Sequence, residues 1–288
     1  MKLALGTVQF GIPYGVANST GQVLESEVLS ILNHAKSLSM DTLDTAIAYG
    51  ESENCLGRVG VTDWNVITKL PEIPNNCPNL AEWIRASLQC SLNRLGISKV
   101  SALLLHRSSQ LLDADKADLW PTLLQLKIEG LVDKIGVSIY TPEELTPLWP
   151  LFKLDLIQAP YNIFDRSLVE SGWLQTMHIN AVEVHVRSIF LQGLLFMSSR
   201  TRPKKFARFQ PLFDRWDGWL KDNRISALQA CILFALSEPR ISRVVVGVDS
   251  LDQLKEISTA TVDRQIDFPA DIYSTDQKLI NPSNWSSL

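Results

Sequence analysis

Four polar residues between positions 44 and 106 have the types and spacing that acid–base chemistry needs. Asp44 and Tyr49 lie five residues apart in the stretch MDTLDTAIAYG. Lys69 ends the run VITK, and His106 ends the run ALLLH. Each apolar run can form a buried strand, and a helix-like segment follows each one. In a parallel barrel the carboxyl ends of the strands share one rim, where active sites gather, so we expect these side chains at one mouth of a barrel.

Seven short strings, taken in order along the chain, resemble those of the aldo-keto reductases. They are LGT near the start, LDTAIAYGESE, ITKL, LLLHR, GVS, IQAPYN and GVDSLDQLKEI, and together they span nearly the whole chain. Each string alone is unspecific, whereas the ordered set is similar to the family's own. The resemblance implies a (β/α)8 TIM barrel and NAD(P)H-dependent carbonyl reduction. It also implies a catalytic tetrad of Asp44, Tyr49, Lys69 and His106.

Reduction of a carbonyl needs a hydride for the carbon and a proton for the oxygen. No side chain carries hydride, so a nicotinamide must supply it. A free tyrosine has a pKa near ~10 and is a slow proton donor at neutral pH, and the ammonium of Lys69 can lower the pKa of Tyr49. Asp44 can hold Lys69 charged and in place, and His106 can orient the carbonyl with a hydrogen bond. Tyr49 is then the general acid in reduction and, as phenolate, the base in oxidation.

Each of the four residues also has a structural interpretation. Asp44 and Lys69 can form a buried ion pair that only fixes the top of the barrel. Tyr49 can be an aromatic residue of the rim. His106 can be a hydrogen-bonded histidine of the core, which is the commoner fate of a single histidine. The agreement of all four with the family pattern favours the catalytic interpretation.

Two other functions remain open. Some proteins of this fold bind the cofactor and serve mainly as partners of other proteins, so the alternative is a regulatory subunit with little turnover. A lyase that forms a Schiff base through Lys69 is a third function, which Asp44 disfavours because a close carboxylate keeps the amine protonated. We expect no metal, because the other histidines, His34, His178 and His185, have no metal-ligand spacing with any partner and no H-x-H pair ends a strand.

The resemblance also implies a cofactor site, although no G-x-G-x-x-G occurs and a Rossmann fingerprint is therefore absent. Ser138 and Gln158 match residues that bind the nicotinamide carboxamide. The string VRSIFLQGLL matches the loop along the pyrophosphate, and GVDSLDQLKEI matches the segment around the adenosine half. The matching cofactor positions are Gly6, Thr7, Asp44, Ser138, Gln158, Arg187, Ser188, Ile189, Phe190, Leu191, Gly193, Gly247, Asp249, Gln253 and Glu256. We expect a small carbonyl compound as substrate, in a pocket that includes Gln9, Phe10 and Tyr14.

The chain departs from the family at several cofactor positions. Arg187 stands where an aromatic residue usually faces the nicotinamide, and its guanidinium can either stack on that ring or point to the pyrophosphate. Ile257 stands where an asparagine commonly binds the adenine. Near the site of the 2′-phosphate, Asp249 replaces a small hydroxyl residue and Gln253 replaces an arginine that many members carry. We therefore expect NADP(H) as the cofactor, with NAD(H) also usable.

The bulk properties fit an ordinary globular protein. The chain has 288 residues, 45% of them hydrophobic, and a formal net charge of −4, which gives no reason to expect nucleic acid or a membrane surface as a partner. No apolar stretch reaches ~18 residues, so we expect no transmembrane helix, and the N-terminus lacks the pattern of a signal peptide. The four cysteines, Cys55, Cys77, Cys90 and Cys231, have no C-x-x-C spacing and are typical of reduced thiols in a cytoplasmic protein.

Alternating strand-like and helix-like segments predict eight β–α units that close into one barrel domain over residues 1–288. The expected strands are residues 3–7, 42–45, 65–70, 100–105, 134–137, 156–159, 181–186 and 244–246. The expected helices are one capped by Ser26 that extends to Leu38, one opened by Pro142, and residues 54–59, 80–95, 119–128, 168–177, 226–236 and 251–257.

Two features modify this plan. Residues 206–220 predict an extra helix before the regular helix that follows strand seven. A basic patch precedes it at residues 200–205 and is either part of an insertion at the catalytic rim or a solvated turn. The N-terminal hairpin that often plugs the barrel's bottom in this family is missing, because the first strand begins at about Leu3. The proline-containing tail, residues 268–288, can cover other surface.

Overall fold

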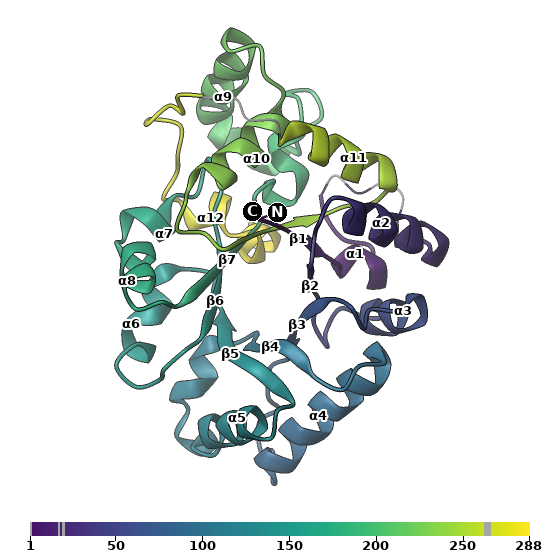
Figure 1. Ribbon diagram of the computed structural model, residues 1–288. Helices are drawn as coiled ribbons and strands as arrows, with labels where there is room; N and C mark the ends of the chain where they lie inside the picture. Colours follow the sequence, from purple (N-terminus) through teal and green to yellow (C-terminus); the bar gives the residue numbers. More distant parts are fainter. Residues whose placement is uncertain (1, 17, 19–20, 262–265) are drawn as a thin grey trace.

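Eight parallel strands form the centre of the protein in the computed structural model, which describes residues 2–16, 18, 21–261 and 266–288. Each strand pairs with the next one along the chain, and β8 pairs with β1, which closes the barrel (Figure 1). The strands are β1 Leu3–Gly6, β2 Thr42–Asp44, β3 Asn65–Leu70, β4 Val100–Leu105, β5 Val132–Ser138, β6 Leu156–Pro160, β7 Glu183–Arg187 and β8 Arg243–Gly247. The predicted (β/α)8 barrel in a single domain is confirmed.

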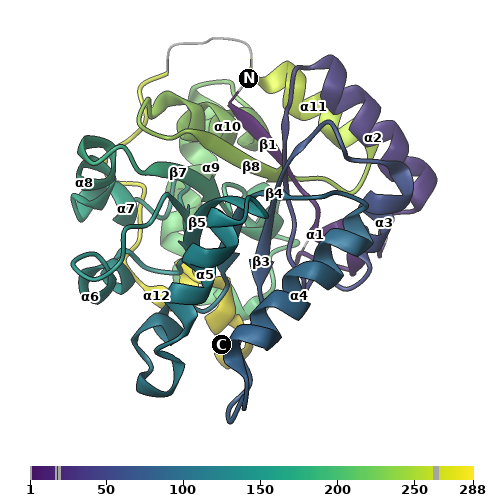
Figure 2. The same ribbon diagram turned by 60° about the horizontal axis from the view of Figure 1, so that its bottom comes forward.

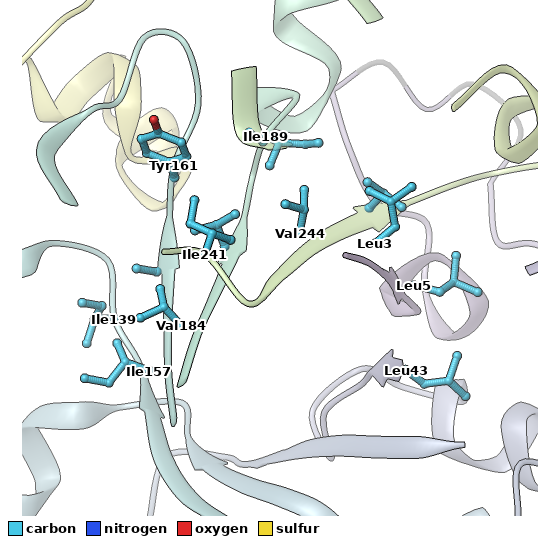
Figure 3. Packing of buried hydrophobic residues seen from close by; sticks show 14 of the residues in the cluster. Leu3, Leu5, Leu43, Ile139, Ile157, Tyr161, Val184, Ile189, Ile241 and Val244 are labelled. Atoms are coloured by element: carbon cyan, nitrogen blue, oxygen red, sulfur yellow. The ribbon is translucent and has the colours of Figure 1, made fainter. Parts of the chain in front are cut away.

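Alternate residues of each strand face opposite sides of the barrel wall. Outward side chains such as Leu3 and Leu43 are buried in the main core cluster that the surrounding helices complete (Figure 3). A separate cluster of Ile67, Ala102, Leu104 and Leu156 fills the lumen. Gly136 also faces inward, and a Cβ there would lie 1.8 Å from the carbonyl oxygen of Leu156, so no larger residue fits. Because apolar side chains fill the middle of the lumen, the inward polar residues gather at its two ends.

Most helices form where the amphipathic segments predict them. Their bounds are α1 Val8–Gly11, α2 Glu25–Ser37, α3 Ser52–Val59, α4 Leu80–Leu95, α5 Leu119–Ile128, α6 Leu145–Leu148, α7 Ser167–Glu170, α8 Trp173–Ile179, α9 Gln210–Asp222, α10 Ala227–Ser237, α11 Leu251–Ala260 and α12 Gln277–Ile280. At the start of α4 the Asn79 side chain accepts a hydrogen bond from the Glu82 amide, and Gly96 ends this helix with a φ of 66°. Ser226 caps α10 in a capping box with Gln229.

Some predicted boundaries are wrong. Leu24 occupies the N-cap of α2, so Ser26 lies inside the first turn and does not cap the helix. The helix expected at residues 168–177 is two short helices, α7 and α8, because Gly172 between them has a φ of 79°. The segment that Pro142 opens is a 3₁₀ turn, η3 Pro142–Glu144, followed only by the one-turn α6. β7 starts later than expected, since Ala181 has a φ of 56°, outside the strand region.

The extra helix predicted between β7 and α10 is confirmed as α9, which follows the 3₁₀ helix η5 Lys204–Phe209. The C-terminal tail packs against this insertion, with the rings of Phe206 and Trp285 4.9 Å apart. The amide of Ser274 donates a hydrogen bond to the carbonyl of Phe164, which lies beyond the carboxyl end of β6. The tail therefore covers part of the barrel end at which the strands terminate, away from the N-terminus in Figure 2.

In the basic patch at residues 200–205, Arg202 and Lys205 make internal contacts, whereas Arg200 and Lys204 are exposed. The Arg202 side chain is 3% exposed, and its guanidinium lies 2.9 Å from the Asp217 carboxylate. Its Cζ is also 4.0 Å from the centre of the Phe213 ring. Lys205 donates a hydrogen bond of 2.8 Å to the carbonyl of Trp285. These contacts attach Arg202 to α9 and Lys205 to the C-terminal tail.

Charged side chains line the opposite end of the lumen, where the strands begin. Arg243 on β8 pairs with Asp41, which precedes β2. Lys134 on β5 pairs with Glu183 on β7, and the buried His185 ring lies within 2.7 Å of the same carboxylate. In the described chain β1 is the first strand. These ion pairs therefore lie at the amino end of the lumen.

Candidate active site

Asp44 and Lys69 form a buried ion pair at the carboxyl ends of β2 and β3. The Lys69 Nζ lies 2.8 Å from each Asp44 carboxylate oxygen and 2.8 Å from the carbonyl oxygen of Thr45. The Lys69 side chain is 0% exposed, and that of Asp44 is 6% exposed. Burial lowers the pKa of Lys69, while the Asp44 carboxylate opposes that shift. All three N–H donors of the ammonium are engaged, so its position is fixed.

Gln158 and Ser138 extend this pair into a network. The Gln158 Nε2 donates a hydrogen bond of 2.6 Å to Asp44 Oδ1, and the Ser138 hydroxyl donates one of 3.2 Å to Gln158 Oε1. The two residues are neighbours because the β5–β6 register sets Ser138 opposite Gln158. Both side chains are buried. Four of the predicted site residues thus form one hydrogen-bonded cluster across four strands.

Tyr49 lies over this cluster. The Lys69 Nζ is 5.1 Å from the centre of the phenol ring, and the His106 ring meets the phenol edge-on with centroids 5.7 Å apart. The pKa of Tyr49 is raised above its ordinary value, first by burial and then by the Asp44 carboxylate, while Arg187 opposes the shift. The net shift is therefore upward rather than downward, because burial outweighs the stabilisation that the Lys69 ammonium can give to the phenolate. The phenol stays protonated at neutral pH, as a proton donor must.

His106 follows β4 at the same mouth. Its backbone amide donates a hydrogen bond to the Leu70 carbonyl, and its side chain is half-buried rather than part of the core. Burial, and then the charge of Lys69, lower the pKa of His106 to about 4. The neutral imidazole can donate one N–H hydrogen bond. The structure thus brings the four predicted tetrad residues together.

Arg187 ends β7, and its guanidinium extends across the mouth to the end of β5. Its Nη2 donates a hydrogen bond of 2.9 Å to the Ile139 carbonyl, and its Nη1 donates one of 3.2 Å to the Ser188 hydroxyl. Its Cζ lies 4.9 Å from the centre of the Tyr140 ring. The sequence prediction missed Tyr140, and the only signal for it was its place two residues after the GVS string.

The loop after β7 has an unusual backbone. Ser188, Leu191 and Gln192 have φ values of 60°, 48° and 53°, and Gly193 follows with 86°. Left-handed conformations cost roughly 1–2 kcal/mol in residues other than glycine and gather at ligand sites. The Asn162 amide supports the loop with a hydrogen bond of 3.1 Å to the Ser188 carbonyl. Within the loop the Leu191 amide donates to the Ser188 carbonyl, and the Gly193 amide donates to the Phe190 carbonyl.

Asp249, just beyond β8, is held from two sides. The Asp249 carboxylate accepts a hydrogen bond of 2.9 Å from the side-chain amide of Asn18. The backbone amide of Asp249 donates a hydrogen bond of 2.7 Å to Gln253 Oε1. Lys255, the nearest cation along the segment, pairs with Asp252 at 3.0 Å instead. This segment thus presents a carboxylate and an amide where a 2′-phosphate would need positive charge.

Some predicted site residues have buried side chains, namely Thr7, Phe10, Ile189 and Leu191. Phe10 is 0% exposed within the core, so its assignment to the substrate pocket is wrong. The Thr7 hydroxyl donates to the Asp44 carbonyl and lies 2.9 Å from another buried hydroxyl, so it is occupied within the protein. Ile189 and Leu191 can meet a ligand only through their backbone. Phe190 is half-buried and Glu256 is exposed.

The loop that follows β1 reaches toward the end of β7. Gln9 packs on Gly247, where a Cβ would lie 2.5 Å from the Gln9 Nε2, and its Oε1 is buried with no hydrogen-bond partner in the described chain. Gly6 pairs with Gly247 in the register of β1 and β8. The Tyr14 hydroxyl accepts a hydrogen bond of 3.1 Å from Gln192. Gln9 and Tyr14 thus lie beside the predicted cofactor segments.

Three further observations bear on the kind of site. The described residues contain no group of three or more His, Cys, Asp or Glu that could hold a metal ion. The four cysteines are free. No helix in the described ranges is both long and apolar enough to cross a membrane.

The sequence pattern of the Aldo/keto reductase family matches residues 2–268. A D-threo-aldose 1-dehydrogenase of a Pseudomonas species is 28% identical over 182 residues, 60% of this chain and 55% of that protein. An NADH-specific methylglyoxal reductase of Escherichia coli is 33% identical over 115 residues, 40% of this chain and 35% of that protein. The chain thus spans about half or less of the length of these two relatives.

Solved structures agree with the fold. An aldo-keto reductase of Bacillus halodurans in its holo form has a TM-score of 0.73 at 21% identity, covering 92% of this chain and 88% of that one. A putative aldo-keto reductase of Pseudomonas aeruginosa has a TM-score of 0.66 at 23% identity, covering 90% and 88%. At these identities the likeness concerns the fold alone.

Proposed function

The chain belongs to the aldo/keto reductase family, and from this premise we propose that it reduces an aldehyde or ketone to an alcohol with NAD(P)H. The observation that carries the proposal is the buried Asp44–Lys69 pair beneath the ring of Tyr49. The neutral His106 ring beside that phenol adds a hydrogen-bond donor. Both named relatives are oxidoreductases by description, which supports the reaction class.

The residues at the mouth fit a nicotinamide dinucleotide. Ser138 and Gln158, which the family resemblance implies as the carboxamide site, lie side by side in the register of β5 and β6 and bond to each other, and Gln158 also bonds to Asp44. The strained loop that contains Ser188 and Gly193 follows β7 at the position that the family resemblance implies for the pyrophosphate, and its first residue, Ser188, contacts Arg187. When bound, the nicotinamide would supply the hydride that no side chain can provide.

Each tetrad residue then has a distinct part in moving the proton. The protonated Tyr49 gives its proton to the carbonyl oxygen and becomes a phenolate. The Lys69 ammonium, 5.1 Å from the phenol ring centre, stabilises that negative charge. Asp44 holds the ammonium in place by hydrogen bonds to both carboxylate oxygens. His106, uncharged at neutral pH, donates a hydrogen bond that orients the carbonyl.

For the cofactor, NADP(H) with NAD(H) also usable fits the segment after β8. Asp249 would repel a 2′-phosphate but can accept a hydrogen bond from a ribose hydroxyl, as acidic residues do in NAD sites of another fold. We expect a preference for NADPH below ~100-fold, which corresponds to less than about 3 kcal/mol. The NADH-specific description of the Escherichia coli relative supports the use of NADH in this family.

The competing functions make different demands on Lys69. Schiff-base formation needs a free amine lone pair, whereas the Lys69 ammonium directs all its donors at Asp44 and Thr45. This geometry disfavours the lyase. A regulatory subunit would bind the cofactor without appreciable turnover.

The test is the Tyr49→Phe variant, assayed with 4-nitrobenzaldehyde and either reduced cofactor. We expect kcat to fall about 10²- to 10⁴-fold, the range for loss of a general acid, with the cofactor Kd unchanged because the phenol proton is needed only in the transition state. Tyr161→Phe is the matched control, since the Tyr161 ring packs on Phe234 in the core. A loss of only a few-fold in Tyr49→Phe would reject Tyr49 as the acid. A wild type that binds the cofactor but turns over no aldehyde would favour the regulatory subunit.

Cofactor choice is tested separately with Asp249→Ser. Removal of the carboxylate is expected to shift the ratio of kcat/KM values toward NADPH, because the repulsion of the 2′-phosphate is lost. Asp252→Ser is the control, since Asp252 is exposed and pairs with Lys255. A wild-type preference for NADPH far above ~100-fold, or a ratio that Asp249→Ser leaves unchanged, would mean that basic residues elsewhere hold the phosphate.

A further inference from the structure

Arg187 carries a positive charge at the barrel mouth that no carboxylate in the described chain neutralises within 4.0 Å. The buried Arg202, by contrast, pairs with Asp217 at 2.9 Å. The acceptors of Arg187 are neutral, namely the Ile139 carbonyl and the Ser188 hydroxyl. The charge of Arg187 therefore acts on whatever occupies the mouth.

The guanidinium is fixed beside the groups that fit a nicotinamide carboxamide. Its hydrogen bond of 2.9 Å ends on Ile139, the residue after Ser138. The Ile139 amide in turn donates a hydrogen bond of 2.8 Å to the Gln158 carbonyl. The Tyr140 ring, 4.9 Å from Cζ, covers the guanidinium by a cation–π contact. A ring held by Ser138 and Gln158 would have this cation as an immediate neighbour.

The charge also reaches the reacting groups. It adds to the lowering of the pKa values of His106 and Lys69, and it opposes the rise in the pKa of Tyr49. These are the directions that a cation facing the same space produces. Because Asp44 and Lys69 neutralise each other, the charge of Arg187 remains as the nearest cation to these groups; it also lowers the pKa of the buried Asp165 carboxyl, which burial raises.

We propose that Arg187 makes the site favour the reduced nicotinamide over the oxidised one, and so suits the protein to carbonyl reduction rather than alcohol oxidation. The oxidised ring is cationic and the reduced ring is neutral, so the guanidinium repels only the oxidised form. An aromatic residue at this position, as the family resemblance implies for most members, has no such charge. Weak binding of the oxidised form also favours its release after each turnover. The inference rests on the proposed function, because it requires a nicotinamide at this mouth.

The test is a binding measurement and needs no turnover. Oxidised and reduced cofactor are titrated, by calorimetry or tryptophan fluorescence, into the wild type, Arg187→Gln and Arg187→Lys. We expect the wild type to bind the reduced form at least about tenfold more tightly, and Arg187→Gln to lower this ratio by about tenfold, as a partly screened charge pair allows. Arg187→Lys keeps the charge and is expected to keep most of the ratio. Arg107→Gln is the matched control, because Arg107 is exposed on the same rim and pairs with Glu72.

Several results would overturn the inference. A wild type that binds both forms equally rejects it without any variant. If Arg187→Gln weakens the binding of the oxidised and the reduced cofactor by the same factor, Arg187 binds a part of the cofactor that both forms share, such as the pyrophosphate. If Arg107→Gln changes the ratio of the two affinities as much as Arg187→Gln does, the ratio reflects the overall charge of the rim. If the ratio is independent of Arg187 while turnover still depends on Tyr49, the inference fails and the proposed function stands. If neither form binds, both fail.

Discussion

The two ends of the barrel lumen both carry ion pairs, but the pairs differ in how much water reaches them. At the carboxyl ends of the strands the side chain of Lys69 is 0% exposed and that of Asp44 is 6% exposed. At the amino ends the side chain of Lys134 is 44% exposed and that of Glu183 is 25% exposed. Water screens the second pair and leaves the first in a low dielectric. The comparison shows that an inward position on a strand is enough to place a charged side chain in the lumen. How strongly that charge acts on its neighbours depends on how deeply it is buried.

What covers each end explains the difference. The carboxyl end is built over by the loop after β1, the α9 insertion and the C-terminal tail. The amino end has Lys2, whose ammonium caps the Glu238 and Pro239 carbonyls, and the charged side chains themselves. Covered groups acquire shifted pKa values and fixed partners, which is what proton transfer requires.

The largest expected effect is that of Lys69→Met compared with Lys134→Met. Loss of Lys69 leaves a buried carboxylate without its partner, which is expected to lower the free energy of unfolding by about 3–5 kcal/mol and to remove the charge that stabilises the Tyr49 phenolate. Lys134→Met is expected to cost less than about 1 kcal/mol, as is usual for exposed pairs. Urea unfolding followed by circular dichroism, together with aldehyde turnover, measures both effects.

A second variant separates stability from chemistry at the buried end. Asp44→Asn combined with Lys69→Met removes the unpaired charge and is expected to recover part of the stability but none of the turnover. If Lys134→Met costs as much stability as Lys69→Met, the two ends do not differ in the way described.

A smaller effect is expected from Glu183→Gln at the exposed end. The His185 ring, and then Lys134 against the opposing effect of burial, lower the pKa of Glu183 from 4.5 to about 2. A carboxyl group whose pKa is lowered by folding stabilises the folded state at pH values above the pKa of that group in the unfolded chain. This stabilisation is lost as the pH falls toward 2. Glu183→Gln should therefore lower the free energy of unfolding by about 1–2 kcal/mol near pH 7, and the deficit should shrink below about pH 4. A deficit that persists in acid would assign the loss to packing; turnover per folded molecule should be unchanged.

The smallest expected effect is that of pH on reduction. His106, with its pKa lowered to about 4, stays neutral, and Tyr49, with its pKa raised, stays protonated. The kcat/KM for reduction should therefore be flat between about pH 6 and about pH 9, and fall only as the pH rises further and the phenol ionises. An alkaline limb centred below about pH 8 would instead show that the effect of the Lys69 ammonium on the pKa of Tyr49 outweighs that of burial.

The sequence by itself determined the barrel and the members of the candidate tetrad. The periodicity of strands and helices depends on residues that are close in the sequence. For this reason both boundaries of α4 were predicted correctly, with Gly96 as its stop. The placement of Asp44 and Lys69 at strand ends is equally local, and parallel strands in a barrel bring such ends together. Family resemblance added the cofactor segments, which periodicity alone does not reveal.

Only the tertiary structure decided the environments of these residues. It turned Phe10 into the core, brought the tail onto the carboxyl end of the barrel, and connected Arg187 to Ile139 on another strand. It also reversed the expected pKa shift of Tyr49, because burial there outweighs the nearby ammonium. Burial and contacts between distant segments depend on how the whole chain packs, and no local pattern specifies them.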